Sequence, residues 1–178
     1  MELATEKGVA RELKNETPVL SLIGTRGKEP EWNNRRQSTG HIGIPLVSTN
    51  FIDTIPMLSR LFSDLGLKLS WLTDSDSGLS IDASSDLSGI FFVENAKEST
   101  DSKGRKIIPM QAFVDAYDIY TVFGIGGQYQ LGNHNIVAII FFTKEKFSKT
   151  IAQRFLPLIN LFKTFTTKHV LQQRIFSD

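Results

Sequence analysis

The chain contains no cysteine. Disulfides, thiolate metal sites, cysteine nucleophiles and thioether-linked tetrapyrroles all require a thiol, so none of them can be present. The absence also fits a protein that works in a reducing compartment. Any catalytic or ligand-binding site must therefore be built from other side chains.

Long hydrophobic runs are also missing. The longest apolar stretch, Ile136 to Phe142, has seven residues, whereas a membrane-spanning helix needs about 20. Residues 1–17 are charged and contain no secretory-signal core. The 20 Lys and Arg residues nearly balance the 19 acidic residues, which gives no electrostatic reason to expect a nucleic-acid partner. We therefore expect a cytoplasmic protein that binds neither nucleic acid nor membranes.

The common catalytic motifs are absent as well. There is no Gly-x-Ser-x-Gly elbow, no His-Glu-x-x-His pattern and no P-loop. The segment Gly124-Ile125-Gly126-Gly127 lacks the third glycine of a dinucleotide-binding loop, because Tyr129 stands there. We interpret these glycines as a turn, a bulge or a close approach of a ligand to the backbone. His41, His134 and His169 have no second ligand at metal-binding spacing, so we expect neither a metal site nor a catalytic residue.

The segments that are present indicate an α+β domain. Residues 1–17 are typical of a short N-terminal helix or linker, and residues 18–178 fit a single domain. The order of the expected elements predicts a central antiparallel sheet of about five to six strands, flanked by helices and followed by a long C-terminal helix. The expected strands are residues 18–25, 41–47, 68–72, 90–93, 120–125 and 136–143, and the expected helices are residues 3–16, 50–65, 110–117 and 148–174.

The last two expected strands should form a hairpin. Residues 120–125 and 136–143 are rich in β-branched and aromatic side chains. Gly-Gly and Gly-Asn pairs lie between them, and such pairs favour tight turns. The sequence therefore predicts an antiparallel hairpin here.

The expected C-terminal helix carries a heptad-like apolar seam. Its members recur at i, i+4, i+7, i+11 and i+14, and they are Ile151, Phe155, Leu158, Phe162 and Phe165. Other apolar residues fall off this seam, so the helix is apolar on more than one face. Pro157 should bend the helix or break its hydrogen-bond ladder. We expect one face to cover the sheet and another to form a homodimer, with an interface built from Phe155, Leu158, Phe162 and Phe165.

The loop between the first two strands contains the best candidates for ligand binding. They are Arg26, Trp32, Arg35, Arg36 and His41. Guanidinium groups beside an indole suit an anion or a planar ligand. An alternative is that Trp32 covers the edge of the core while Arg26 and Arg35 pair with Glu29, Glu31 or exposed backbone carbonyls. In that case the cluster only holds the loop in place.

The segment from Thr25 to Leu46 resembles a GAF-like sensory family that occurs in multidomain histidine kinases of bacteria, often cyanobacteria. The resemblance rests on the spaced patterns Arg-Gly-x-Glu-Pro-x-Trp-Asn and Gly-His-x-x-Ile-Pro-Leu. It continues at Pro56-Met57, at residues 113–117 and 122–127, and through the strand 136–143. It therefore covers roughly residues 18 to 165.

The resemblance implies a GAF/PAS-like fold and a non-catalytic input module. Such a module senses a small molecule or a redox change and passes a conformational change along its terminal helices to a kinase or another output domain. Phe123, inside one of the resembling segments, joins the candidate ligand-binding residues. The resemblance names no ligand or cofactor. The chain departs from the family pattern because it has neither a phosphoacceptor histidine motif nor ATP-binding glycine boxes, so the output domain is expected in cis or in trans.

Two other functions fit the same residues. The chain could be a freestanding small-molecule-binding protein. It could also be an enzyme that acts on a small anion through Arg26, Arg35 and His41, with the histidine as acid or base.

Overall fold

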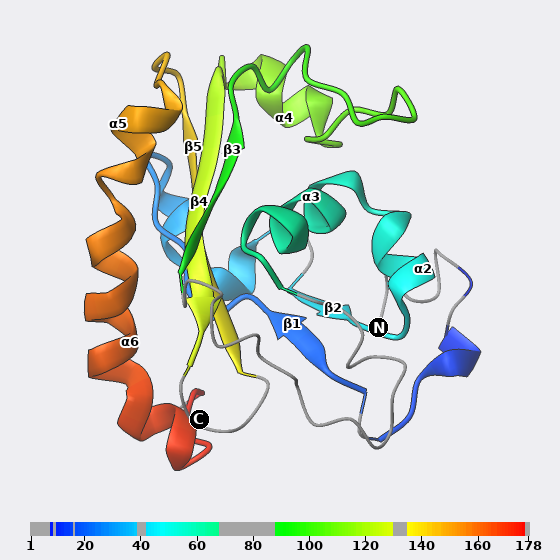
Figure 1. The fold of residues 1–178 in the computed structure, drawn as a ribbon, viewed down its shortest axis with the longest axis vertical. Coiled ribbons are helices and arrows are strands. Elements are labelled where there is room, and N and C mark those ends of the chain that lie inside the picture. Colours follow the sequence, from blue (N-terminus) through cyan, green and yellow to red (C-terminus); the bar gives the residue numbers. More distant parts are fainter. Residues whose placement is uncertain are drawn as a thin grey trace.

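The computed structural model describes residues 8, 10–15, 17–38, 42–67, 88–129 and 135–176. Helices lie on both sides of a three-stranded antiparallel sheet of order β3-β4-β5, with α5 and α6 on one side and α2, α3 and α4 on the other (Figure 1). The strands are β1 (Val19–Ser21), β2 (Gly43–Pro45), β3 (Gly89–Val93), β4 (Thr121–Gln128) and β5 (Ile136–Thr143). The helices are α2 (Thr49–Asp53), α3 (Pro56–Asp64), α4 (Gln111–Ala116), α5 (Lys149–Gln153) and α6 (Leu156–Leu171), with 3-10 turns η1 (Ala10–Glu12), η2 (Pro30–Asn33) and η3 (Arg35–Gln37).

The expected central sheet of five to six strands is wrong for the described residues. β1 and β2 form a separate two-stranded sheet. In that pair, the Leu46 amide donates to the Pro18 carbonyl. The nitrogen of the preceding residue, Pro45, therefore lies on the outer edge of β2. Because proline has no N–H, this edge cannot continue a full ladder to another strand. The mixed α and β content, the antiparallel pairing and the long C-terminal helix are confirmed, whereas the expected strand 68–72 lies outside the described residues.

The predicted hairpin is confirmed, but its first strand is longer than expected. β4 pairs with β5 from Thr121, opposite Thr143, to Gln128, opposite Ile136. Gly126 and Gly127 therefore lie inside a regular strand, and their interpretation as a turn or bulge is wrong. A Cβ on Gly126 would lie 2.7 Å from the Val137 carbonyl oxygen and 2.8 Å from the Leu65 Cδ1 atom. A side chain at Gly126 is thus excluded by the backbone of β5 and by Leu65, the residue that follows α3.

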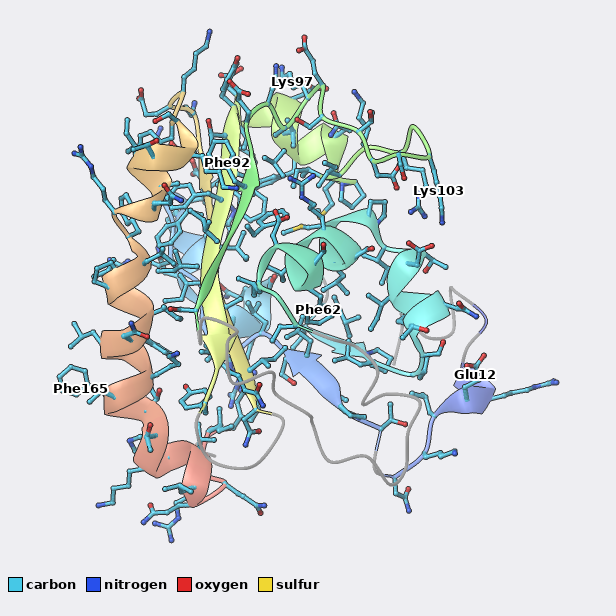
Figure 2. All side chains as sticks on the ribbon, in the orientation of Figure 1. Glu12, Phe62, Phe92, Lys97, Lys103 and Phe165 are labelled. Carbon is cyan, nitrogen blue, oxygen red and sulfur yellow. The ribbon has the colours of Figure 1, made fainter. Side chains whose placement is uncertain are left out.

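Side chains of β4 alternate between two layers of core. Val122 packs with the α3 side, whereas Phe123 and Ile125 pack with the α5 and α6 side, as does Tyr129 directly after the strand. The largest fully buried side chains come from both layers and include Phe62, Phe91, Phe123, Ile125 and Ile159 (Phe62 is labelled in Figure 2). Burial of these aromatic and aliphatic groups is the main stabilising contribution to the fold. β4 is therefore the element that both layers share.

The expected helix 50–65 is divided into α2 and α3 at a proline. Ile55, the residue before Pro56, has extended dihedral angles (φ −114°, ψ 93°), as expected for a residue that precedes proline. The hydroxyl of Ser48 accepts a hydrogen bond from the Phe51 amide and caps α2. α3 is followed by Gly66, whose φ of 69° suits a glycine at a helix end.

Proline also divides the C-terminal helix, as predicted. Ser148 caps α5, and Pro157 lies in the first turn of α6. The predicted helix 110–117 is confirmed as α4. Of the expected N-terminal helix, the structure describes Gly8 and residues 10–15, where Ala10–Glu12 form a 3-10 turn. Within the described part of the chain, no helix has both the length and the hydropathy that a membrane span requires.

Candidate functional site

The motif Arg-Gly-x-Glu-Pro-x-Trp-Asn folds back on itself in the loop before β2. The side-chain oxygen of Asn33 accepts a hydrogen bond from the Gly27 amide at 3.0 Å, and the side-chain nitrogen donates to the Glu29 carbonyl at 3.1 Å. The Trp32 amide also donates to the Glu29 carbonyl. A Cβ on Gly27 would lie 2.4 Å from the Trp32 ring, so glycine is required where the indole covers the backbone. The motif therefore fixes the position of Trp32.

Trp32 packs on a cluster of aromatic rings. Its ring centroid lies 4.5 Å from that of Tyr117 and 5.7 Å from that of Phe113, and Phe113 lies 5.7 Å from Phe142. Phe113 lies in α4, Tyr117 directly follows that helix and Phe142 lies in β5. Trp32 is half-buried, so part of the indole stays accessible. This packing agrees with the interpretation that Trp32 covers the edge of the core, and it joins the loop to the sheet.

The structure places the four arginine and histidine candidates differently. Arg26 and Arg36 are exposed, and His41 lies outside the described residues. Arg35 is half-buried, and its guanidinium carbon lies 4.6 Å from the ring centroid of Phe176. In the described part of the chain, no ion pair joins these arginines to Glu29 or Glu31. Arg35 therefore makes a cation–π contact with the C-terminal segment.

The contact between Arg35 and Phe176 depends on how α6 ends. Gln173 has a positive φ of 54°, and the Arg174 amide donates to the His169 carbonyl at 2.9 Å. This is the geometry in which a left-handed residue ends a helix and reverses the chain. No sequence pattern joins Arg35 to Phe176, because they lie at opposite ends of the chain and the contact depends on the whole fold.

Phe123 is not brought together with Trp32. It is 1% exposed, and its ring lies 4.7 Å from Phe141 and 5.2 Å from Phe155. Phe141 and Phe142 point to opposite faces of β5, and Phe142 belongs to the Trp32 side. Phe123 therefore belongs to the aromatic core under α5 and α6, on the other face of the sheet.

The four residues expected at a dimer interface lie on two sides of the C-terminal helices. Phe155 and Phe162 pack inward on the sheet. Leu158 and Phe165 are 47% and 73% exposed, and Figure 2 shows Phe165 projecting from α6 away from the sheet. Leu161, which the seam omitted, is 54% exposed on the same outward side. Its spacing from Leu158, i to i+3, could have indicated this.

Polar contacts tie the inner side of α6 to the end of β4. The Tyr129 hydroxyl and the Thr166 hydroxyl are 2.7 Å apart. The Lys163 ammonium donates to the Gln128 carbonyl at 3.4 Å, and burial lowers the pKa of Lys163. These residues were not among the sequence-predicted candidates, because single Tyr, Thr and Lys residues carry no distinctive spacing.

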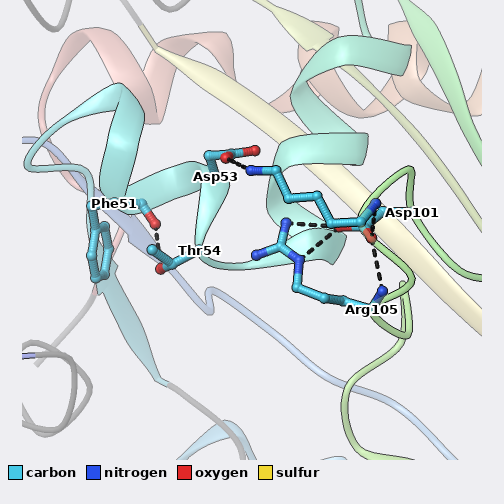
Figure 3. A network of polar contacts seen from close by, with 6 residues as sticks. Phe51, Asp53, Thr54, Asp101 and Arg105 are labelled. Carbon is cyan, nitrogen blue, oxygen red and sulfur yellow. Dashed lines mark hydrogen bonds and ion pairs between the residues drawn. The ribbon is translucent and has the colours of Figure 1, made fainter.

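A second polar network joins α2 to the loop after β3 (Figure 3). The Asp101 carboxylate accepts hydrogen bonds from the Lys103 and Arg105 amides and from the Arg105 side chain. Asp53 pairs with Lys103. The hydrogen bond from Lys103 and its charge lower the pKa of Asp53. Burial raises the pKa of Asp101, but the hydrogen bonds from Arg105 and Lys103 outweigh burial and the net pKa is lowered. Asp53 and Asp101 each pair with a cation, so this network holds the loop after β3 in place.

The described residues contain no group of three His, Asp or Glu side chains arranged to hold a metal ion. The contacts of Trp32 and the cation–π contact of Arg35 with Phe176 make their loop the candidate site. Comparison of the chain with family models, with curated proteins and with solved structures finds no match.

Proposed function

We propose that the chain is a cytoplasmic, non-catalytic input module of bacterial signal transduction. It binds a small molecule at the Trp32 and Arg35 loop and passes a conformational change through its terminal helices to an output domain such as a histidine kinase. One observation carries this proposal. Arg35, a residue whose sequence context predicts ligand binding, contacts Phe176, which lies shortly after the end of α6.

The contact between Arg35 and Phe176 could transmit ligand binding to the end of α6. A cation–π pair at an exposed site contributes about 0.5–1 kcal/mol. A hydrogen bond to a charged group contributes about 1.5–3 kcal/mol. A ligand carboxylate or phosphate that pairs with the Arg35 guanidinium and draws it away from the ring would therefore release Phe176. Release of Phe176 would loosen the chain reversal at Gln173 and alter the end of α6, whose inner side stays fixed to β4 by Ile159 and Thr166.

Retention of a small molecule tests the ligand-binding part of the proposal. We would purify the protein gently and record its absorbance spectrum and native mass spectrum. The wild-type protein is expected to carry a small molecule, and Arg35→Gln is expected to lose it because the guanidinium contributes charge and hydrogen bonds that glutamine cannot replace.

Lys28→Gln is the matched control, since Lys28 is an exposed cation of the same loop. This variant should retain the molecule. Equal retention by wild type and Arg35→Gln would place the ligand elsewhere. An empty wild-type protein would exclude a tightly bound signal and would favour a purely structural transmitter.

A further inference from the structure

The outward face of α6 is an apolar stripe. Leu158, Leu161 and Phe165 are spaced i, i+3 and i+7, which places them on one side of the helix. All three are exposed, whereas Ile159 and Val170 on the inner side are buried. The opposite side of this helix packs on the core. The three outward apolar side chains therefore form a surface that a partner can cover.

Charge is unevenly distributed between this helix and the rest of the chain. Residues 146–177 hold six of the 20 Lys and Arg residues and none of the 19 acidic residues, so the rest has 14 basic against 19 acidic residues. The nearly neutral total therefore conceals a basic C-terminal region. Arg154 lies four residues before Leu158, and Lys168 lies three residues after Phe165. Both are exposed, so the stripe has a cation near each end.

We propose that this stripe is the docking surface for an acidic amphipathic helix of the output partner. The partner's apolar residues would pack on Leu158, Leu161 and Phe165, and its carboxylates would pair with Arg154 and Lys168. The expected homodimer through α6 is disfavoured by the same charges. Symmetric antiparallel pairing of two copies would bring Arg154 of one copy towards Lys168 of the other, and like charges at an interface are repulsive.

The size and charge of the stripe predict how strong the binding is and how it responds to salt. It spans about 10 Å of helix, at about 1.5 Å per residue. Such a small area fits a transient signalling contact better than a permanent one. Because the charged residues are exposed, added salt should weaken the binding. This inference rests on the proposed role of α6 as the output helix.

A pair of synthetic helical peptides tests the inference. Each peptide has about three heptads with an apolar seam, and the flanking positions are all Glu in one and all Lys in the other. Binding to the full chain is measured by fluorescence anisotropy at low salt, below the concentration at which the peptides self-associate. We expect the Glu peptide to bind at least about ten times more tightly than the Lys peptide. Phe165→Glu should weaken that binding about tenfold or more.

Charge reversal provides the decisive variant. The double change Arg154→Glu and Lys168→Glu should invert the preference, so that the Lys peptide binds more tightly. Met110→Glu is the control, because Met110 is an exposed apolar residue beside α4, on the other side of the sheet. This variant should leave both affinities unchanged.

Other results would overturn the inference. No binding of either peptide, equal binding of both, or a preference that survives charge reversal would each exclude an acidic helix as the partner. A dimer that Phe165→Glu converts to a monomer would assign the stripe to a second copy. Binding to phosphatidylserine vesicles without any peptide preference would assign it to a lipid surface. Ligand retention is measured separately, so failure of the peptide experiment is distinguishable from failure of the proposed function.

Discussion

At the scale of single residues, two glycines determine how closely α3 approaches the sheet. A Cβ on Gly89 would lie 2.8 Å from the Leu65 Cα atom, and one on Gly126 would lie 2.8 Å from the Leu65 Cδ1 atom. Both neighbours belong to the residue that ends α3. Since Leu65 and Phe62 are almost fully buried, the helix cannot withdraw without exposing apolar surface. Gly89 of β3 and Gly126 of β4 therefore allow α3 to pack closely on the sheet.

Alanine substitution tests this interpretation. Gly126→Ala should lower the free energy of unfolding by about 1–3 kcal/mol, because overpacked cores respond by strain. The added methyl group would meet the Val137 carbonyl oxygen at 2.7 Å, and a backbone atom in a ladder cannot rotate away. Gly24→Ala is the control, since nothing lies within 4 Å of its Cβ position. Denaturant unfolding measures both variants, and equal stabilities would contradict the account.

At the scale of elements, prolines decide where the expected long helices divide. The apolar spacing across residues 50–65 is continuous in the sequence, yet Pro56 starts a new helix. Pro157 does the same for α6. α6 packs on the sheet with the side that carries Ile159 and Phe162, so Leu158 and Phe165, at the other edge of the expected seam, face outward. Periodicity alone could predict that the C-terminal region is helical, but it could not predict which face each phenylalanine occupies.

Phe162 and Phe165, three residues apart on α6, should therefore respond differently to the same change. Phe162→Glu places a carboxylate against the core at Ile125 and Val137, and it should cost about 3 kcal/mol or more. Phe165→Glu changes an exposed side chain and should alter stability by less than about 0.5 kcal/mol. Thermal unfolding followed by circular dichroism compares them. Comparable destabilisation by both variants would show that the outward face is covered in the folded protein.

At the scale of the whole molecule, the sequence predicted single elements better than it predicted contacts between distant segments. The hairpin, β3 and α4 follow from short runs whose composition decides their conformation, as in the β-branched residues of β5. The size of the sheet depends on which strands meet, and β1 and β2 form a sheet of their own beside β3-β4-β5. The candidate loop was predicted from its arginines and Trp32. Its contact with Phe176 could not be predicted, because only the complete fold brings the two ends of the chain together. Pairing between distant segments is set by packing and not by local residue pattern.

The central claim is that the Arg35 loop and the end of α6 are coupled, and hydrogen–deuterium exchange of Arg35→Gln tests it most directly. The amides of Gln172, Gln173 and Arg174 donate to carbonyls of the last turns of α6, so they report on the chain reversal that places Phe176 under Arg35. Loss of a cation–π pair worth about 0.5–1 kcal/mol should accelerate their exchange about two- to fivefold. Arg36→Gln, which removes the same charge from the neighbouring exposed residue, should leave exchange unchanged. Unchanged exchange in Arg35→Gln, or equal acceleration in both variants, would contradict the account.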